Sequence, residues 1–106
     1  MSPREELIKE LKQEIDNNQV VLFAKGTKEQ PRCGFSAMTI QILNSYGIDF
    51  KVVDVLIDME KKEALKELSE WPTIPQLYVN KEFVGGCDIT RELHETGQLK
   101  AILEKV

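Results

Sequence analysis

The spacing of apolar and polar residues along the chain predicts four helical segments and four strands. Apolar residues recur at helical intervals in four stretches, at residues 3–16, 34–46, 58–69 and from 88 onward. Short apolar runs predict strands at residues 20–24, 50–56, 76–79 and 82–85. The first run is apolar throughout, which is typical of a strand buried on both faces. Asn80-Lys81 separates the last two runs and predicts a two-residue hairpin turn.

Residues with strong positional preferences mark the starts of these helices. Ser2, Pro3 and Glu5 match a capping box with proline at the first helical position, so they predict the start of the first helix. Asp58 and Asp88 are expected to cap the third and fourth helical segments.

The same periodicity predicts which side chains of the middle helices face the core. For the second helix these are Phe35, Met38, Ile42, Leu43 and Tyr46. For the third helix they are Met59, Leu65 and Leu68, with residues 60–63 facing outward. Two glycines predict helix ends, Gly47 after the second helix and Gly97 within the last segment.

The order of the elements favours an α/β fold in a single domain spanning residues 1–106. The first two strands are joined through a helix, so we expect them to be parallel with a right-handed crossover. The hairpin adds an antiparallel pair. The economical arrangement is a mixed four-stranded sheet flanked by helices on both faces, which is the thioredoxin-like layout.

Composition and charge narrow the function classes. The 106 residues are 42% hydrophobic and 30% charged, as in an ordinary globular domain. No apolar stretch approaches the roughly 20 residues that span a bilayer, so no membrane association is expected. The net charge of −4 argues against nucleic acid as a partner, because phosphate contacts require a surplus of Lys and Arg.

Cysteine and histidine are scarce. Cys33 and Cys87 are the only cysteines and His94 is the only histidine, too few for a disulfide scaffold or a four-ligand zinc site of these residue types. His94 lies among charged residues and is interpreted as a surface side chain. No secretory signal is recognisable, so a reducing, cytoplasmic location is expected.

Cys33 is the candidate reactive residue. It lies in a loop that opens into a helix, where backbone N–H groups and the helix dipole favour the thiolate. Basic residues outnumber acidic ones nearby, with Lys25, Lys28 and Arg32 against Glu29. The alternative is an inert buried cysteine.

Ser36 occupies the position at which a C-x-x-C motif would have its second thiol, so no disulfide can form within the motif. Oxidation of Cys33 must therefore involve an outside thiol, a metal or Cys87. A regulatory bridge between Cys33 and Cys87 is one hypothesis, and it requires Cα atoms roughly 4.4–6.8 Å apart.

Two further segments carry binding chemistry. Proline at the end of Trp71-Pro72-Thr73-Ile74-Pro75, just before a strand, suggests a cis Ile74–Pro75 bond that leaves the Ile74 backbone free for a peptide-like ligand. An ordinary trans proline is the alternative. Gly85-Gly86-Cys87-Asp88 combines backbone N–H groups with a carboxylate, which suits the head group of an α-amino acid. A plain helix cap is the alternative there.

These segments together resemble the monothiol glutaredoxins of the CGFS type, and the resemblance covers nearly the whole chain. The motif is Cys33-Gly34-Phe35-Ser36. Three further blocks follow the family's order and spacing: Lys25-Gly26-Thr27, Trp71-Pro72-Thr73-Ile74-Pro75-Gln76-Leu77 and Gly85-Gly86-Cys87-Asp88-Ile89.

The resemblance implies glutathione binding and a [2Fe–2S] cluster shared by two copies of the chain. The cluster requires four thiolates, which two Cys33 residues and two glutathiones would supply. Glutathione would lie along the Ile74 backbone, with its γ-glutamyl end at Cys87 and Asp88 and its glycine carboxylate at Lys25 and Lys62. The family often has Arg where this chain has Lys62. Lysine keeps the positive charge but cannot form the two parallel hydrogen bonds that arginine makes with a carboxylate. Phe35 would pack beside the cluster or in the core.

Three functions therefore compete. The leading one is a carrier that transfers the cluster to apo iron–sulfur proteins. The second is a glutathione-dependent thiol–disulfide oxidoreductase, in which a second glutathione resolves the intermediate. The third is a cluster-sensing adaptor for a partner, which the family implies to be of the BolA type. An organellar location remains an alternative to the cytoplasm.

Overall fold

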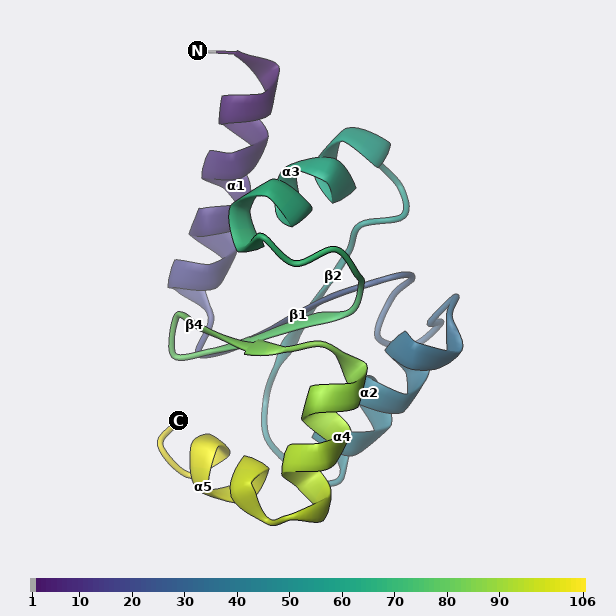
Figure 1. Ribbon diagram of the computed structural model, residues 1–106, viewed down its shortest axis with the longest axis vertical. Helices are drawn as coiled ribbons and strands as arrows, with labels where there is room; N and C mark the ends of the chain where they lie inside the picture. Colours follow the sequence, from purple (N-terminus) through teal and green to yellow (C-terminus); the bar gives the residue numbers. More distant parts are fainter. Residues whose placement is uncertain (1) are drawn as a thin grey trace.

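Five helices and four strands follow one another along residues 2–106, the part of the chain that the computed structural model describes (Figure 1). They are α1 (Pro3–Asn17), β1 (Val20–Ala24), α2 (Gly34–Asn44), β2 (Lys51–Asp54), α3 (Met59–Ser69), β3 (Gln76–Val79), β4 (Glu82–Gly85), α4 (Cys87–Glu95) and α5 (Gln98–Leu103). The predicted order is confirmed. Gly97, with φ of +82°, separates α4 from α5 as its position predicted.

The strands form one mixed sheet in the order β2-β1-β3-β4. β1 pairs in parallel with β2 and antiparallel with β3, and β3 and β4 form the antiparallel hairpin. Asn80 and Lys81 have φ of +49° and +70°, as a type I′ turn requires. All five residues of β1 are buried, which confirms it as an interior strand of a thioredoxin-like sheet.

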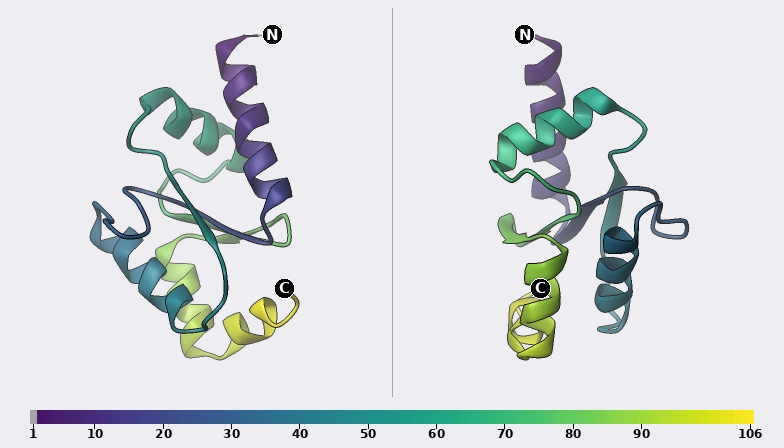
Figure 2. Two further views of the ribbon diagram at one scale, coloured as in Figure 1. Left: turned by 180° about the vertical axis from the view of Figure 1, so that it is seen from behind. Right: turned by 45° about the vertical axis from the view of Figure 1, so that its right-hand side comes forward.

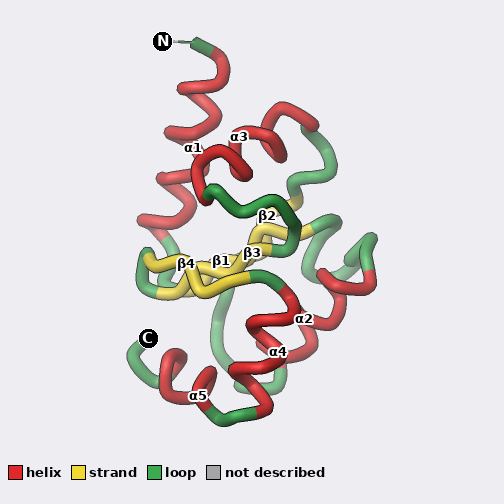
Figure 3. The backbone as a smooth tube through the Cα atoms, viewed as in Figure 1, coloured by secondary structure: helices red, strands yellow, loops and turns green. Residues whose placement is uncertain are grey.

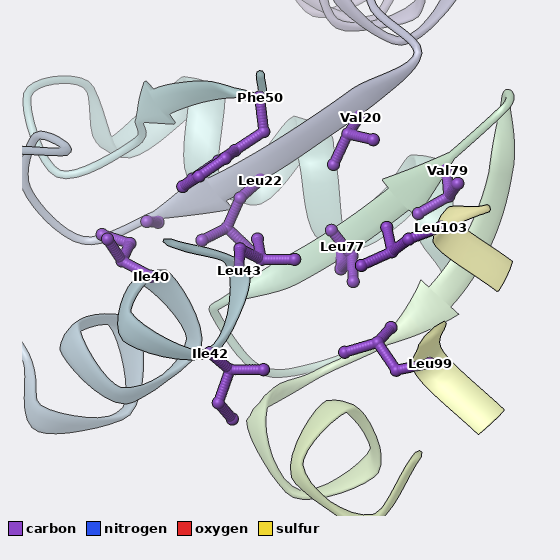
Figure 4. Close-up of a cluster of buried hydrophobic side chains, with 11 residues drawn as sticks. Val20, Leu22, Ile40, Ile42, Leu43, Phe50, Leu77, Val79, Leu99 and Leu103 are labelled. Carbon is purple, nitrogen blue, oxygen red and sulfur yellow. The ribbon is translucent and has the colours of Figure 1, made fainter. Parts of the chain in front are cut away.

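Helices cover both faces of the sheet, which lies as a thin layer between them (Figure 3). α1 and α3 lie on one face, while α2, α4 and α5 lie on the other (Figures 1 and 2). Side chains of β1 alternate between the two faces, so Leu22 joins one core cluster and Phe23 the other. Figure 4 shows the cluster that lies between the sheet and the helices α2 and α5, including Leu22, Leu43, Leu77 and Leu99.

The helix starts follow the capping predictions with one correction. The Ser2 hydroxyl accepts the Glu5 N–H at 3.1 Å, and the Asp58 carboxylate accepts the Glu60 N–H at 3.0 Å. Asp88, however, does not cap α4. The cap is Gly86, whose carbonyl accepts the Thr90 N–H at 3.0 Å, so the helix begins two residues earlier than an Asp88 cap predicts and Asp88 lies in its first turn.

The predicted inner faces of α2 and α3 are partly wrong. Phe35 and Met59 are 60% and 69% exposed, and Met38 is also exposed. Ser36 and Thr39 are instead fully buried, together with the apolar residues that follow them on α2. Bulky apolar residues dominated the pattern, whereas small polar residues allow α2 to start close to the end of β1.

Candidate functional site

Cys33 stands at the start of α2, at the end of the loop that follows β1. Its backbone is extended, with φ of −147°, and its carbonyl accepts the Ala37 N–H at 2.9 Å. The residue is half-buried and its thiol is free. The thiol is therefore held at a helix N-terminus without being enclosed in the core.

The surroundings of Cys33 favour its ionised form. Burial by itself opposes ionisation, but the N–H groups of Ser36 and Phe35, the Lys25 charge and the Ser36 hydroxyl outweigh it. The pKa of Cys33 consequently lies below the ordinary value for a cysteine. A half-buried thiolate of this kind can act as a nucleophile or as a metal ligand.

Backbone hydrogen bonds hold the two sides of the loop before Cys33 together. The Arg32 N–H donates to the Lys25 carbonyl at 2.8 Å, and the Thr27 N–H donates to the Gln30 carbonyl at 3.2 Å. Gly26 has φ of +99°, and a Cβ there would lie 2.5 Å from the Arg32 nitrogen. The loop prediction from sequence is confirmed, and a glycine is required where its two sides approach.

A groove of about 370 Å³ lies beside the start of α2. Five of the six residues singled out from the sequence line it: Lys25, Lys62, Ile74, Cys87 and Asp88. Cys33 does not line the groove itself; its neighbour Phe35 does, and so does Lys25, whose charge acts on the thiol. Segments far apart in the sequence thus meet at one hollow next to the thiol.

Charge is distributed unevenly along the groove. Lys25, Lys62 and Lys66 contribute three ammonium groups, and Asp88 contributes a carboxylate at the start of α4. The N-terminus of α4 adds unpaired backbone N–H groups beside Asp88. A ligand with two carboxylates and one ammonium would find opposite charges for each of them.

Some lining residues were given no role of their own from the sequence: Lys66 was not named, and Trp71 and Thr73 were named only as members of the segment that precedes β3. Lys66 follows Lys62 by one helical turn, so the i, i+4 spacing was a signal that could have identified it. Trp71 and Thr73 also line the groove, and their carbonyls each accept a hydrogen bond at 3.1 Å from the buried Gln76 amide. The buried Gln76 side chain therefore fixes the backbone of the segment that forms this wall of the groove. No sequence pattern indicates this role.

The wall continues at Ile74–Pro75, whose peptide bond is cis, as the sequence suggested. Ile74 itself is 6% exposed and lines the groove. Neither its N–H nor its C=O finds a hydrogen-bond partner in residues 2–106. Its backbone is thus free to pair with an extended ligand.

Cys87 also lies at a helix start, but its burial and its contacts differ from those of Cys33. It is buried, and its thiol donates to the Met38 sulfur at 3.7 Å. Both cysteines are free, so the structure contains no Cys33–Cys87 bridge. His94 is exposed, as expected, and its Nδ1 lies 2.6 Å from the Tyr46 hydroxyl oxygen.

No helix within residues 2–106 is long and apolar enough to cross a membrane. In that same part of the chain, no three His, Cys, Asp or Glu side chains are grouped so as to hold a metal ion.

Comparison with known proteins identifies the family. The model of the glutaredoxin family matches residues 20–84. A probable monothiol glutaredoxin 2 of Rickettsia conorii is 53% identical over 94 residues, covering 89% of this chain and 88% of its own. The mitochondrial monothiol glutaredoxin-5 of Saccharomyces cerevisiae is 50% identical over 103 residues, covering 94% and 69%.

Solved structures agree with this assignment. Reduced poplar apo GrxS14 superimposes with a TM-score of 0.83 at 46% identity, over 93% of this chain and 91% of its own. The Cys33-Gly34-Phe35-Ser36 motif, with serine in place of the second thiol, is consistent with the CGFS type. The chain therefore belongs to the glutaredoxin family, as one of its monothiol members.

Proposed function

We propose that this protein binds glutathione in the groove beside Cys33. Glutathione is a tripeptide with two carboxylates and one ammonium, which matches the three lysines and Asp88 of the groove. In this arrangement the Ile74 backbone pairs with the peptide, while Cys87 N–H and Asp88 hold the γ-glutamyl end. Lys25 and Lys62 hold the glycine carboxylate.

The proposal extends to a [2Fe–2S] cluster shared between two copies of the chain. The cluster has four thiolate ligands, and it would provide the iron–sulfur unit that an acceptor protein needs. Each chain offers one half-exposed, ionisable thiol, Cys33, because Cys87 is buried against Met38. Two Cys33 thiolates and two glutathione thiolates complete the set. The position of one such thiol next to a groove whose charged groups match those of glutathione is the observation that carries this function.

Delivery to apo iron–sulfur proteins follows from the same ligand set. Half of the thiolates come from a dissociable tripeptide, and the other half come from separate chains. Such a cluster is released more easily than one held by four cysteines of a single chain. A BolA-type protein could replace one copy as a regulatory partner. A reducing compartment, such as the cytoplasm or an organelle, would keep both cysteines free.

A second activity is favoured by the lowered pKa of the Cys33 thiol. The Cys33 thiolate would attack a protein–glutathione mixed disulfide, taking the glutathionyl sulfur and releasing the protein thiolate. A second glutathione would then attack this intermediate, giving oxidised glutathione and free Cys33, because Ser36 cannot resolve it. Reduction of a glutathionylated substrate, coupled to glutathione recycling, measures this activity.

Anaerobic reconstitution with iron, sulfide and glutathione tests the main proposal. The wild-type protein should develop a visible absorption spectrum and migrate as a dimer. Cys33→Ser should abolish both, whereas Cys87→Ser, the matched control at the other helix start, should retain both. A colourless monomeric wild-type protein under these conditions would refute the proposal.

A further inference from the structure

A single carboxylate joins the two loops that follow the parallel strands. Asp54 is the last residue of β2, and its Oδ1 accepts the Gly26 N–H at 3.0 Å. The same oxygen accepts the Leu56 N–H at 2.8 Å. Gly26 belongs to the loop that leads to Cys33, and Leu56 belongs to the loop that leads to α3. One side chain outside the groove wall thus fixes both.

The segment held by Asp54 is also held from the opposite side. The Lys25 N–H donates to the Ser36 hydroxyl at 3.0 Å, and the next N–H along the chain, that of Gly26, donates to Asp54. Ser36 is fully buried in α2, so it provides a fixed point. Lys25 and Gly26 are therefore clamped between α2 and β2, and the Lys25 side chain leaves the clamp to line the groove.

Removing the Asp54 carboxylate would leave a buried donor without a partner. Gly26 is buried, and an unpaired buried N–H is costly enough for the surrounding loop to rearrange. Such a rearrangement would move Lys25 first, because the two residues share a peptide bond. The cysteine loop and the Leu56 loop would also lose their common anchor.

We propose that Asp54 is a positioning residue for ligand binding, which acts by holding Lys25 in place at the groove. This inference rests on the proposed binding of glutathione. Asp54 does not contact the ligand. By fixing the backbone next to Lys25, it restricts the positions that the Lys25 ammonium can occupy. Binding then requires less ordering of that flexible side chain.

Calorimetric titration of the apo-protein with glutathione tests the proposal through variants. Asp54→Ala should weaken binding about fivefold, the cost of ordering one flexible side chain. Asp54→Asn retains an acceptor oxygen and should bind nearly as the wild type does. Asp49→Ala removes an exposed aspartate just before β2 and should have no effect. In a Lys25→Ala background, Asp54→Ala should cause no further loss, because its effect passes through Lys25.

The proposal is overturned if Asp54→Ala binds glutathione as tightly as Asp49→Ala does, or if its effect adds fully to that of Lys25→Ala. A wild-type protein without affinity for glutathione would instead refute the proposed function. The clamp can then be judged alone by amide hydrogen exchange. Exchange at Gly26 and Leu56 should accelerate in Asp54→Ala while β1 stays protected, and unchanged exchange at both would refute the clamp.

One measurement needs no variant and remains decisive if Asp54→Ala fails to fold. In the wild-type protein, an NMR experiment that detects couplings across hydrogen bonds should connect the amide nitrogens of Gly26 and Leu56 to the same carboxyl carbon, that of Asp54. Absence of both couplings would contradict the shared hydrogen-bond acceptor.

Discussion

The two cysteines of this protein both stand at helix starts, yet their surroundings differ sharply. Cys33 precedes α2, is half-buried and has the N–H groups of the first turn and Lys25 around its sulfur. Cys87 is the first residue of α4, is buried and directs its thiol at the Met38 sulfur. A helix N-terminus alone therefore does not make a thiol reactive.

The difference follows from where each cysteine stands relative to the first helical residue: Cys33 precedes it, whereas Cys87 is that residue. A residue that precedes the first turn keeps an extended backbone, so its side chain can reach the free N–H groups. A residue within the first turn contributes its own N–H instead, and its side chain turns into the packing around the helix. Cys33 thus supplies a sulfur ligand or nucleophile, while Cys87 offers a backbone donor to the groove.

The largest expected effect is on thiol reactivity. Iodoacetamide should modify Cys33 about a hundredfold faster than Cys87 in the native protein, because only Cys33 is both accessible and readily ionised. Peptide mass spectrometry after brief labelling measures both rates. In urea the two rates should approach each other, and similar rates in the native protein would remove the distinction between the two sites.

The loop that delivers Cys33 should also be more sensitive than the helix turn that follows it. Gly26→Ala should lower the free energy of unfolding by about 2 kcal/mol, because φ is positive and a Cβ would meet the Arg32 nitrogen at 2.5 Å. Gly34→Ala is the matched control, since nothing lies within 4 Å of its Cβ position. Urea denaturation measures both, and equal losses would contradict the role of the closed loop.

A smaller effect separates two neighbouring lysines of α3. Lys62 lines the groove and Lys61 does not. Lys62→Ala should therefore weaken glutathione binding about fivefold, the value of one exposed ion pair, while Lys61→Ala should leave it unchanged. Titration calorimetry distinguishes them, and identical losses would indicate a general charge effect in place of a specific contact.

The smallest effect concerns the pH dependence of Cys33. The thiolate reacts, so its alkylation rate falls as the pH drops through the pKa of the folded protein, which is lower than for an ordinary cysteine. Lys25→Ala and Ser36→Ala each remove a group that stabilises the thiolate, so each should move the curve to higher pH. Lys28→Ala should not, because the Lys28 ammonium lies 3.9 Å from the centre of the Phe50 ring.

Sequence reasoning predicted the order of the elements because strong local signals mark them. The apolar run of β1 and the hairpin turn at Asn80-Lys81 are of this kind. It failed for the inner face of α2, where Ser36 and Thr39 are buried in place of Phe35 and Met38. That choice depends on how closely the helix approaches the sheet, which local periodicity does not encode.

The candidate site, like the fold, was predicted only in part. Residues in recognisable motifs, such as Asp88 and Ile74, were identified from sequence and line the groove. The structural roles of Asp54 and Gln76 were not predicted, because these roles consist of hydrogen bonds from their side chains to backbone groups of the folded loops. Such contacts exist only once the chain is folded, and no spacing along the sequence signals them.

The ligand stoichiometry of the reconstituted protein tests the central claim most directly. Acid treatment of the purified coloured dimer should release two glutathiones for every two irons, because Cys33 of each chain leaves two positions for outside thiolates. Quantifying thiols and iron in the same sample provides the ratio. A coloured dimer that releases no glutathione would contradict the account. Its cluster would then have to be held by protein ligands alone, and residues 2–106 contain no group of three such ligands.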